Sequence, residues 1–233
     1  MMENRTSKYV PGDVLCVMPA MNEASVIAGT ISELVELGFR VLCIDDGSND
    51  ETGTIAGKAG AYVVRHPVNL GQGASLQTGF EIALKGHVDI SFVATFDADG
   101  QHSAGSLLEM LTCFDEDADL EIVLGSRFLK KDNTVPFQKR FALQFAAFLA
   151  RFTYGLHLTD RHNGLRLLRL SVVEKIDLKV LGYGHADEFL KLIKKHKTNY
   201  REWPVTITYN DYTKSKGQPL INSFRIVFDR LFE

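Results

Sequence analysis

The chain turns from apolar to acidic within the stretch Ile90-Ser91-Phe92-Val93-Ala94-Thr95-Phe96-Asp97-Ala98-Asp99-Gly100-Gln101. Its first half is typical of a buried strand, so the carboxylates of Asp97 and Asp99 are expected just past the strand end. Two like charges this close raise each other's pKa unless a cation neutralises them. Hard divalent ions take oxygen ligands and often share them with substrate phosphates. The stretch therefore predicts a metal ion, a phosphate-bearing substrate and a cleft at a sheet edge.

Two further apolar runs, 14–18 and 39–44, also end in polar loops. The first leads into Pro19-Ala20-Met21-Asn22-Glu23 and the second into Asp45-Asp46-Gly47-Ser48. In sheets built from parallel strands, ligands bind outside the carboxyl ends of the strands. Capping of the next helix is an alternative role for Asp45 and Asp46. Acidic groups after three separate strands nevertheless favour a binding cleft over three unrelated solvated loops.

Helical spacing of apolar residues separates these runs. It predicts helices over 24–37, 52–59 and 73–84, with a short strand over 61–65. Strands that alternate with helices of this length indicate βαβ units. The predicted fold is therefore α/β, with a mostly parallel central sheet flanked by helices.

The second half of the chain has a different character. We expect a strand over 121–124, a helix from Asp187 to about 196, a strand over 203–209 and an amphipathic helix over 220–233. The segment 135–158 has no acidic residue and carries phenylalanines at three- and four-residue steps. Such a stripe fits a helix packed into the core, or a basic amphipathic helix on a membrane surface.

Composition narrows the function classes. The 233 residues have a net charge of −3, which lacks the basic footprint of a nucleic-acid coat. Three widely spaced cysteines do not form a zinc or disulfide pattern and favour a reducing, cytoplasmic compartment. A polar start predicts no signal peptide, and the longest apolar stretch is too short to span a bilayer.

The ordered series of loops resembles family 2 glycosyltransferases, and most closely their dolichyl- or polyprenyl-phosphate mannosyltransferase-like branch. The resemblance runs from residue 14 to about 228 and rests on Pro19-Ala20-Met21-Asn22-Glu23, Asp45-Asp46-Gly47-Ser48, Asn69-Leu70-Gly71-Gln72-Gly73, Asp97-Ala98-Asp99-Gly100-Gln101, Gly125-Ser126-Arg127-Phe128 and Asn163-Gly164-Leu165-Arg166. The chain departs from the family pattern at Gln72, where a lysine is expected, and at Met21, where an aromatic residue is commoner.

This resemblance implies one GT-A domain over 1–233 that transfers a sugar, with inversion, from a nucleotide-diphosphate sugar such as a GDP- or UDP-sugar. Residues 14–128 would form the nucleotide-sugar half, 129–219 the acceptor half and 220–233 the closing helix. The donor would contact Pro19, Asn22, Glu23, Asp45, Asp46, Ser48, Gly73, Asp97 and Lys216. The metal, Mg²⁺ or Mn²⁺, would be held by Asp97, Asp99 and Gln101. The acceptor would be bound by Arg127, Arg140 and Arg166.

The catalytic group implied by the resemblance comprises Asp99, Arg127 and Asp187. A polyprenyl phosphate acceptor is already an anion and attacks without a base, whereas a sugar hydroxyl on a lipid-linked glycan or polysaccharide precursor needs one. Asp187 or Glu188 would be that base, although both could simply stabilise a helix N-terminus.

The expected partners are the donor, a lipid-linked acceptor and the cytoplasmic face of a membrane, which the protein would bind peripherally. The closing helix could instead serve a homodimer. A nucleotide-sugar-binding module without transfer activity is the alternative from another functional class, and no nucleic acid partner is expected.

Overall fold

The computed structural model describes residues 8–86, 89–129, 156, 158–161, 163–182 and 184–208. Within them, seven strands form one sheet in the order β3-β2-β1-β4-β6-β5-β7. The strands are β1 (Val14–Ala20), β2 (Arg40–Asp45), β3 (Tyr62–Arg65), β4 (Phe92–Thr95), β5 (Ile122–Ser126), β6 (Arg166–Arg169) and β7 (Tyr200–Pro204). The helices are the 3-10 turn η1 (Pro11–Asp13), α1 (Ile27–Glu36), α2 (Thr52–Lys58), α3 (Gln72–Lys85), α4 (Ala104–Glu116), α6 (Leu170–Val173) and α7 (His185–His196).

The sheet is mostly parallel, as the sequence predicts. The parallel pairs are β1–β2, β1–β4, β2–β3 and β5–β7, whereas β6 runs antiparallel to both β4 and β5. The reversal of β6 follows from where it begins. Gly164 packs against Asp97 just beyond β4, so the next strand starts at the carboxyl edge and returns the opposite way.

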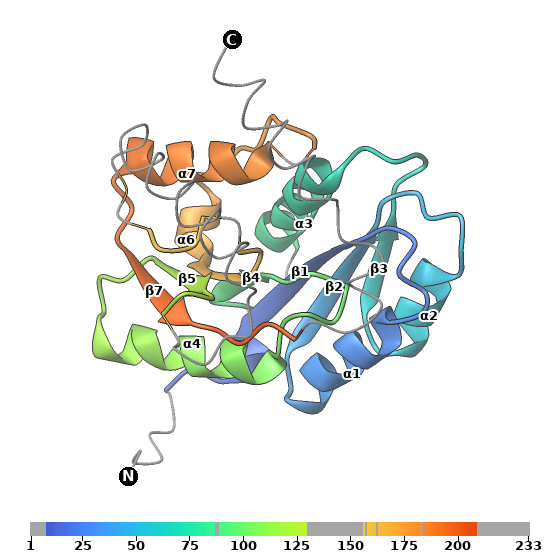
Figure 1. Cartoon of the computed structure of the whole chain (residues 1–233), viewed down its shortest axis with the longest axis horizontal. Helices are drawn as coiled ribbons and strands as arrows, with labels where there is room; N and C mark the ends of the chain where they lie inside the picture. The colour runs from blue at the N-terminus through green and yellow to red at the C-terminus, as the bar shows by residue number, and fades with distance from the viewer. Residues whose placement is uncertain are drawn as a thin grey trace.

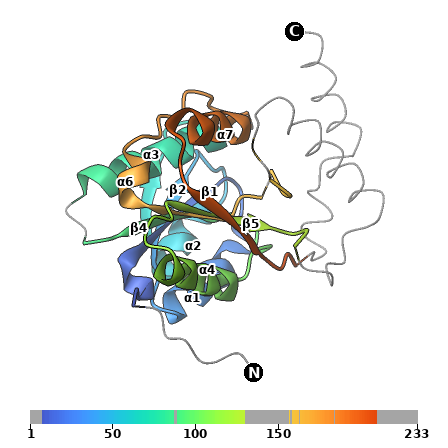
Figure 2. The ribbon, with the colours of Figure 1, turned by 90° about the vertical axis from the view of Figure 1, so that its left-hand side faces the viewer.

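Helices cover both faces of the sheet. Figure 1 shows α3, α6 and α7 above it and α1, α2 and α4 below it, and Figure 2 shows the same two layers edge-on. Each layer has its own apolar core. One core includes Ile31 of α1 and Met110 of α4, and the other includes Phe80 of α3 and Phe189 of α7. Strand β1 lies between them and is buried along almost its whole length.

Helix α4 has no counterpart among the predicted elements. Its start is marked by Ser103, whose side chain accepts a hydrogen bond from the backbone N–H of Gly105 at 3.2 Å. Its buried residues Leu107, Met110 and Phe114 keep helical spacing. An N-cap serine followed by this periodicity is a signal that the sequence contains.

Two predicted boundaries are wrong. Helix α1 begins at Ile27 and not at residue 24, because the backbone N–H groups of Glu23 and Ala24 donate to the side chains of Thr52 and Asp50. The late strand is β7 and not 203–209, because the chain leaves β5 after residue 204. Ile207 instead forms an antiparallel bridge with His102.

Several predictions fall outside the described residues. They concern Arg140, Lys216, most of the aromatic segment 135–158 and the closing helix 220–233. The division of the chain into a donor half and an acceptor half also stays a prediction. Across the described ranges, no helix combines the length and the apolar character that crossing a membrane requires.

Candidate active site

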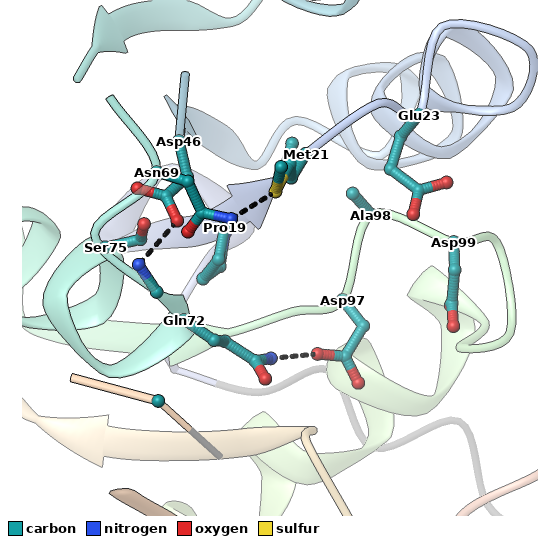
Figure 3. Close-up of a pocket in the computed structure, with 13 residues that line it drawn as sticks. Pro19, Met21, Glu23, Asp46, Asn69, Gln72, Ser75, Asp97, Ala98 and Asp99 are labelled. Atoms are coloured by element: carbon teal, nitrogen blue, oxygen red, sulfur yellow. Dashed lines mark hydrogen bonds between the residues drawn. The ribbon is translucent and has the colours of Figure 1, made fainter. Parts of the chain in front are cut away.

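A pocket of about 510 Å³ opens at the carboxyl ends of β1, β2 and β4 (Figure 3). Strands β2 and β4 lie on opposite sides of β1, so the strand order reverses at this point. Crevices at such reversals are the usual ligand sites of α/β sheets. The lining residues are Pro19, Ala20, Met21, Glu23, Asp46, Asn69, Gly71, Gln72, Ser75, Asp97, Ala98, Asp99 and Gly182.

Five of the residues predicted for the donor and metal line this pocket: Pro19, Glu23, Asp46, Asp97 and Asp99. They come from the three loops that the sequence singles out. Figure 3 shows Glu23, Asp97 and Asp99 on one side and Asp46 on the other. The predicted acidic cleft at the strand ends is therefore present in the fold.

Asn22 and Ser48 join two of these loops to each other. The backbone N–H of Asn22 donates to Ser48 Oγ at 3.0 Å, and the backbone N–H of Asn49 donates to Asn22 Oδ1 at 2.8 Å. Asn22 adopts a left-handed backbone conformation with φ of 55°, which asparagine tolerates better than most residues. These bonds fix the loop after β1 against the loop after β2.

The adjacent aspartates after β2 have different environments. Asp45 is fully buried, and its Oδ1 accepts a hydrogen bond from the backbone N–H of Ser48 at 2.9 Å. Its Oδ2 lies 3.6 Å from Arg65 Nη1. Neither aspartate caps α2, whose start has no side-chain cap. Asp45 thus lies within the wall of the site, and donor contact by Asp45 stays a prediction.

Asp46 holds the glycine-rich loop in place. Its carboxylate accepts hydrogen bonds from the backbone N–H groups of Leu70 at 2.9 Å and Gly71 at 2.7 Å, and contacts His66 Nδ1 at 2.8 Å. Burial opposes ionisation of Asp46, but these bonds outweigh it, so its pKa lies below the usual value. The loop that starts α3 is therefore anchored to the end of β2.

Gly73 permits a close backbone contact across the pocket wall. Its N–H donates to the carbonyl oxygen of Leu181 at 2.7 Å, and a Cβ there would lie 2.0 Å from the carbonyl oxygen of Val180. The structure thus explains Gly73 by packing of α3 against 180–182. Its predicted donor contact remains untested.

Asp97 has three neighbours that fix its orientation. Gln72 Nε2 donates to Oδ1 at 3.2 Å, and His102 Nε2 lies 3.1 Å from Oδ2. Gly164 packs against the same carboxylate so closely that a side chain at residue 164 would collide with it. Burial opposes ionisation of Asp97, but the hydrogen bond and charge of His102 and the charge of Arg166 hold its pKa below the usual value. An ionised Asp97 therefore faces the pocket.

Asp99 shows the opposite shift. Burial first, and the charge of Asp97 second, raise the pKa of Asp99 to about 6. The backbone N–H of Gln101 donates to Asp99 Oδ1 at 3.0 Å, but this bond does not offset the two effects. A cation would offset both effects, because it favours the charged form of a carboxylate that lies beside another.

The donor atoms present fit a hard divalent ion. No group of three His, Cys, Asp or Glu side chains in the described part of the chain forms a metal site by itself. Mg²⁺, however, is commonly bound by one or two carboxylates with substrate phosphates completing its coordination. Asp97 and Asp99 match that pattern. The structure gives the backbone of Gln101 a contact with Asp99, and metal binding by its side chain stays a prediction.

Arg127 follows β5 and is held by a buried aspartate. Its Nε and Nη2 donate to the two carboxylate oxygens of Asp160 at 2.6 and 2.7 Å, and its backbone N–H donates at 3.0 Å. Asp160 is 5% exposed. Such a two-pronged pair fixes the plane of the guanidinium.

Arg166 opens β6 and is almost fully buried. Its guanidinium lies 4.4 Å from the ring centre of Phe189, and burial lowers its pKa to about 10 against the opposing charges of Asp97 and Asp160. It therefore stays cationic at neutral pH. Its charge interacts with both carboxylates, one of which lines the pocket while the other holds Arg127.

The two candidate bases lie in the first turn of α7. Asp187 Oδ1 accepts a hydrogen bond from Arg161 Nη2 at 3.1 Å. Glu188 accepts from the backbone N–H groups of Lys179 and Val180 at 2.8–3.1 Å. Glu188 thus holds the turn before α7, while Asp187 is part of an ion pair.

Ser75 was not singled out by the sequence. It lines the pocket, is fully buried, and its hydroxyl has no hydrogen-bond partner among the described residues. It lies in the first turn of α3, two residues after the glycine-rich motif. Only the fold reveals that this face of α3 turns toward the pocket.

The chain belongs to glycosyl transferase family 2, whose model matches residues 15–177. The GT-A fold and the assignment as a glycosyltransferase are thereby confirmed.

Among related proteins, the chain is 26% identical over 237 residues to a UDP-N-acetylglucosamine--dolichyl-phosphate N-acetylglucosaminyltransferase of Methanococcus voltae, covering 92% of this chain and 93% of that protein. It is 29% identical over 217 residues to a polyprenol monophosphomannose synthase of Mycolicibacterium smegmatis, covering 85% and 80%. These relatives confirm the resemblance to the polyprenyl-phosphate branch of the family.

The fold is similar to a solved structure of glucosyl-3-phosphoglycerate synthase from Mycobacterium tuberculosis. The TM-score is 0.63 at 18% sequence identity, over 90% of this chain and 73% of that chain. At this identity the likeness concerns the fold alone.

Proposed function

We propose that this protein transfers a sugar, with inversion, from a nucleotide-diphosphate sugar to a polyprenyl phosphate in a divalent-metal-dependent reaction. The observation that carries the proposal is the pocket at the ends of β1, β2 and β4, in which Asp97 and Asp99 lie together and burial and Asp97 raise the pKa of Asp99 to about 6. The relatives that act on dolichyl phosphate and polyprenol cover most of the chain and support the same acceptor class.

On the donor side, the residues of the pocket would bind and orient the nucleotide sugar and the metal. Gln72 and His102 hold Asp97, and Asp97 and Asp99 would hold Mg²⁺ or Mn²⁺. When bound, the metal neutralises charge on the leaving nucleotide diphosphate. The unpartnered hydroxyl of Ser75 supports a further polar contact with the donor, because buried polar groups are rarely left without a partner.

On the acceptor side, Arg127 and Arg166 would bind the acceptor phosphate. A guanidinium presents paired N–H donors that match phosphate oxygens, and Arg127 is already fixed in orientation by Asp160. The phosphate is an anion at neutral pH and attacks the anomeric carbon without a base. We also propose that Arg140 binds the acceptor and that Lys216 binds the donor.

Product analysis tests the reaction directly. The protein would be incubated with labelled UDP- and GDP-sugars, Mn²⁺ and a short polyprenyl phosphate, and the lipid phase would be examined for label. We expect a lipid-linked sugar that disappears with a chelator. No lipid-linked product with any of these donors would overturn the proposed acceptor, and nucleotide binding without product or hydrolysis would favour a binding module.

Transfer to a sugar hydroxyl of a lipid-linked glycan or a polysaccharide precursor is the second candidate, with Asp187 or Glu188 as base. The first-turn position of Asp187 on α7 favours it, because Gly182, which lies just before this helix, lines the pocket. Asp187→Asn separates the two candidates. Retained turnover supports the phosphate acceptor, whereas loss of turnover with intact donor binding supports a base.

The proposed site of action is the cytoplasmic face of a membrane, to which the protein would bind peripherally because its acceptor is a lipid. Vesicle flotation with and without polyprenyl phosphate measures this association. Pairing of two copies through the closing helix remains an alternative use of that segment, and sedimentation at several concentrations would detect it.

A further inference from the structure

Arg127 and Asp160 bring two distant parts of the sequence into contact. The two residues are 33 positions apart in sequence, and their side chains are bonded to each other. Ser126 Oγ lies 2.6 Å from Thr159 Oγ1, next to the Arg127–Asp160 pair. Two pairs of adjacent residues, 33 positions apart in sequence, therefore form one polar junction.

Glu202 of β7 stabilises this junction through hydrogen bonds. Its carboxylate accepts hydrogen bonds from the backbone N–H of Thr159 at 2.8 and 2.9 Å, from Thr159 Oγ1 at 3.0 Å, and from the backbone N–H of Asp160 at 3.1 Å. Strand β7 is paired in parallel with β5, which carries Ser126 at its end. Glu202 thus fixes the backbone of Asp160 to the strand next to the one that leads into Arg127.

The contacts connect Glu202 to Arg127 through Asp160. Arg127 engages both oxygens of Asp160, so the guanidinium plane follows the carboxylate plane. The backbone of Asp160 is in turn held in place by its hydrogen bond to Glu202. Asp160 is 5% exposed, so little water competes for its bonds to Arg127, which directly follows the carboxyl end of β5.

We propose that Asp160 and Glu202 are positioning residues that hold Arg127 in the orientation in which it receives the acceptor phosphate. The inference rests on the proposed function and goes beyond it, because it assigns two acidic residues to a site for an anion. Acidic groups near a phosphate site would normally repel the ligand. Here Asp160 is neutralised by Arg127, and Glu202 accepts hydrogen bonds from three N–H or O–H donors. Both carboxylates therefore help to orient Arg127.

A double-mutant cycle on the full-length protein tests this inference. Asp160→Asn is expected to raise the KM for a short polyprenyl phosphate by about tenfold or more, since small misplacements of a binding group have large kinetic effects. Glu202→Gln is expected to give a smaller rise, because its amide oxygen still accepts hydrogen bonds. Donor and Mn²⁺ affinity should stay unchanged in both variants.

The decisive comparison is made in the Arg127→Ala background. If Asp160 acts through Arg127, adding Asp160→Asn to Arg127→Ala leaves the acceptor KM where Arg127→Ala put it. A merely structural role predicts that the two effects multiply, and that result would overturn the inference. An unchanged acceptor KM for Arg127→Ala alone would instead contradict the acceptor site of the proposed function.

Glu121→Gln is the matched control. Glu121 accepts a hydrogen bond from the backbone N–H of Asn199 at 2.8 Å, and so holds the opposite end of the same β5–β7 pair. The substitution Glu121→Gln removes a carboxylate of similar structural role that has no contact with Arg127. We expect a lower melting temperature with an unchanged acceptor KM. If Asp160→Asn is too unstable to assay, Glu202→Gln carries the same cycle.

Discussion

The two sides of the candidate site neutralise charge in opposite ways. On the donor side, Asp97 and Asp99 face one pocket, and the pKa of Asp99 is raised to about 6 by burial and by its neighbour. On the proposed acceptor side, Arg127 is paired with Asp160 at 2.6 Å, and the nearby sequence adds a second pair, Arg161 with Asp187 at 3.1 Å. In the proposed function Asp99 receives its counter-charge from a bound metal ion, whereas the arginines on the proposed acceptor side have theirs within the chain.

The largest effect is expected from Asp99→Asn. The variant keeps the shape of the side chain and removes one metal-binding charge, so transfer should fall about a hundredfold or more, since metal stabilisation of charge is worth several kcal/mol. Steady-state assays across a Mn²⁺ titration measure the loss. Asp115→Asn, in an exposed position on α4, is the control and should leave turnover unchanged. Equal activity of Asp99→Asn and wild type would break the contrast between the two sides.

Gly73→Ala tests the joint between α3 and the segment 180–182. A Cβ would lie 2.0 Å from the carbonyl oxygen of Val180, so we expect a loss of about 2 kcal/mol or more in the free energy of unfolding. Urea titration measures it. Gly29→Ala in α1 is the control, because a Cβ there meets nothing within 4 Å, and it should add roughly 0.5–1 kcal/mol. A harmless Gly73→Ala would argue for a donor contact in place of packing.

The outline of the site could be predicted because it follows from strand ends. Runs of apolar residues locate β1, β2 and β4, and parallel strands bring the loops that follow them to one edge. The roles within that edge could not be read in the same way. Asp45 and Asp46 are adjacent in sequence, yet one is buried in the wall and the other anchors the glycine-rich loop.

Long-range pairs were the part that the sequence does not encode locally. Glu202 holds Thr159 and Asp160 from more than forty positions along the chain, and nothing near Glu202 signals that partnership. The antiparallel direction of β6 was equally hidden, because it depends on where Gly164 packs against Asp97.

The pH dependence of metal binding sharpens the account of Asp99. A carboxyl whose pKa is raised to about 6 binds a proton in competition with the metal. Mn²⁺ affinity should therefore be constant above about pH 7 and fall as the pH drops through 6, by up to about tenfold per pH unit. Calorimetric titrations from pH 5 to 8 measure it. Asp99→Asn should abolish the slope, and a flat wild-type profile would contradict the raised pKa.

A smaller effect is expected from Gln72→Lys. Gln72 holds Asp97 without a charge, so an ammonium in its place would partly neutralise the carboxylate and compete with the metal. Mn²⁺ affinity should fall by about threefold to tenfold, as expected for a partly exposed ion pair. Gln72→Met has similar length and no charge, and separates this effect from the loss of the hydrogen bond. If both variants bind Mn²⁺ alike, charge at residue 72 is irrelevant.

The most direct test of the central claim is the thermal stability of the protein with UDP or GDP, measured with Mn²⁺ and with a chelator. Ligand at a hundred times its Kd stabilises the folded state by about 2.7 kcal/mol, which corresponds to a shift of about 5 °C or more for a chain of this size. We predict that shift for at least one nucleotide with Mn²⁺ and its loss with the chelator or in Asp99→Asn. An equal shift without metal would contradict a donor side that needs an external cation.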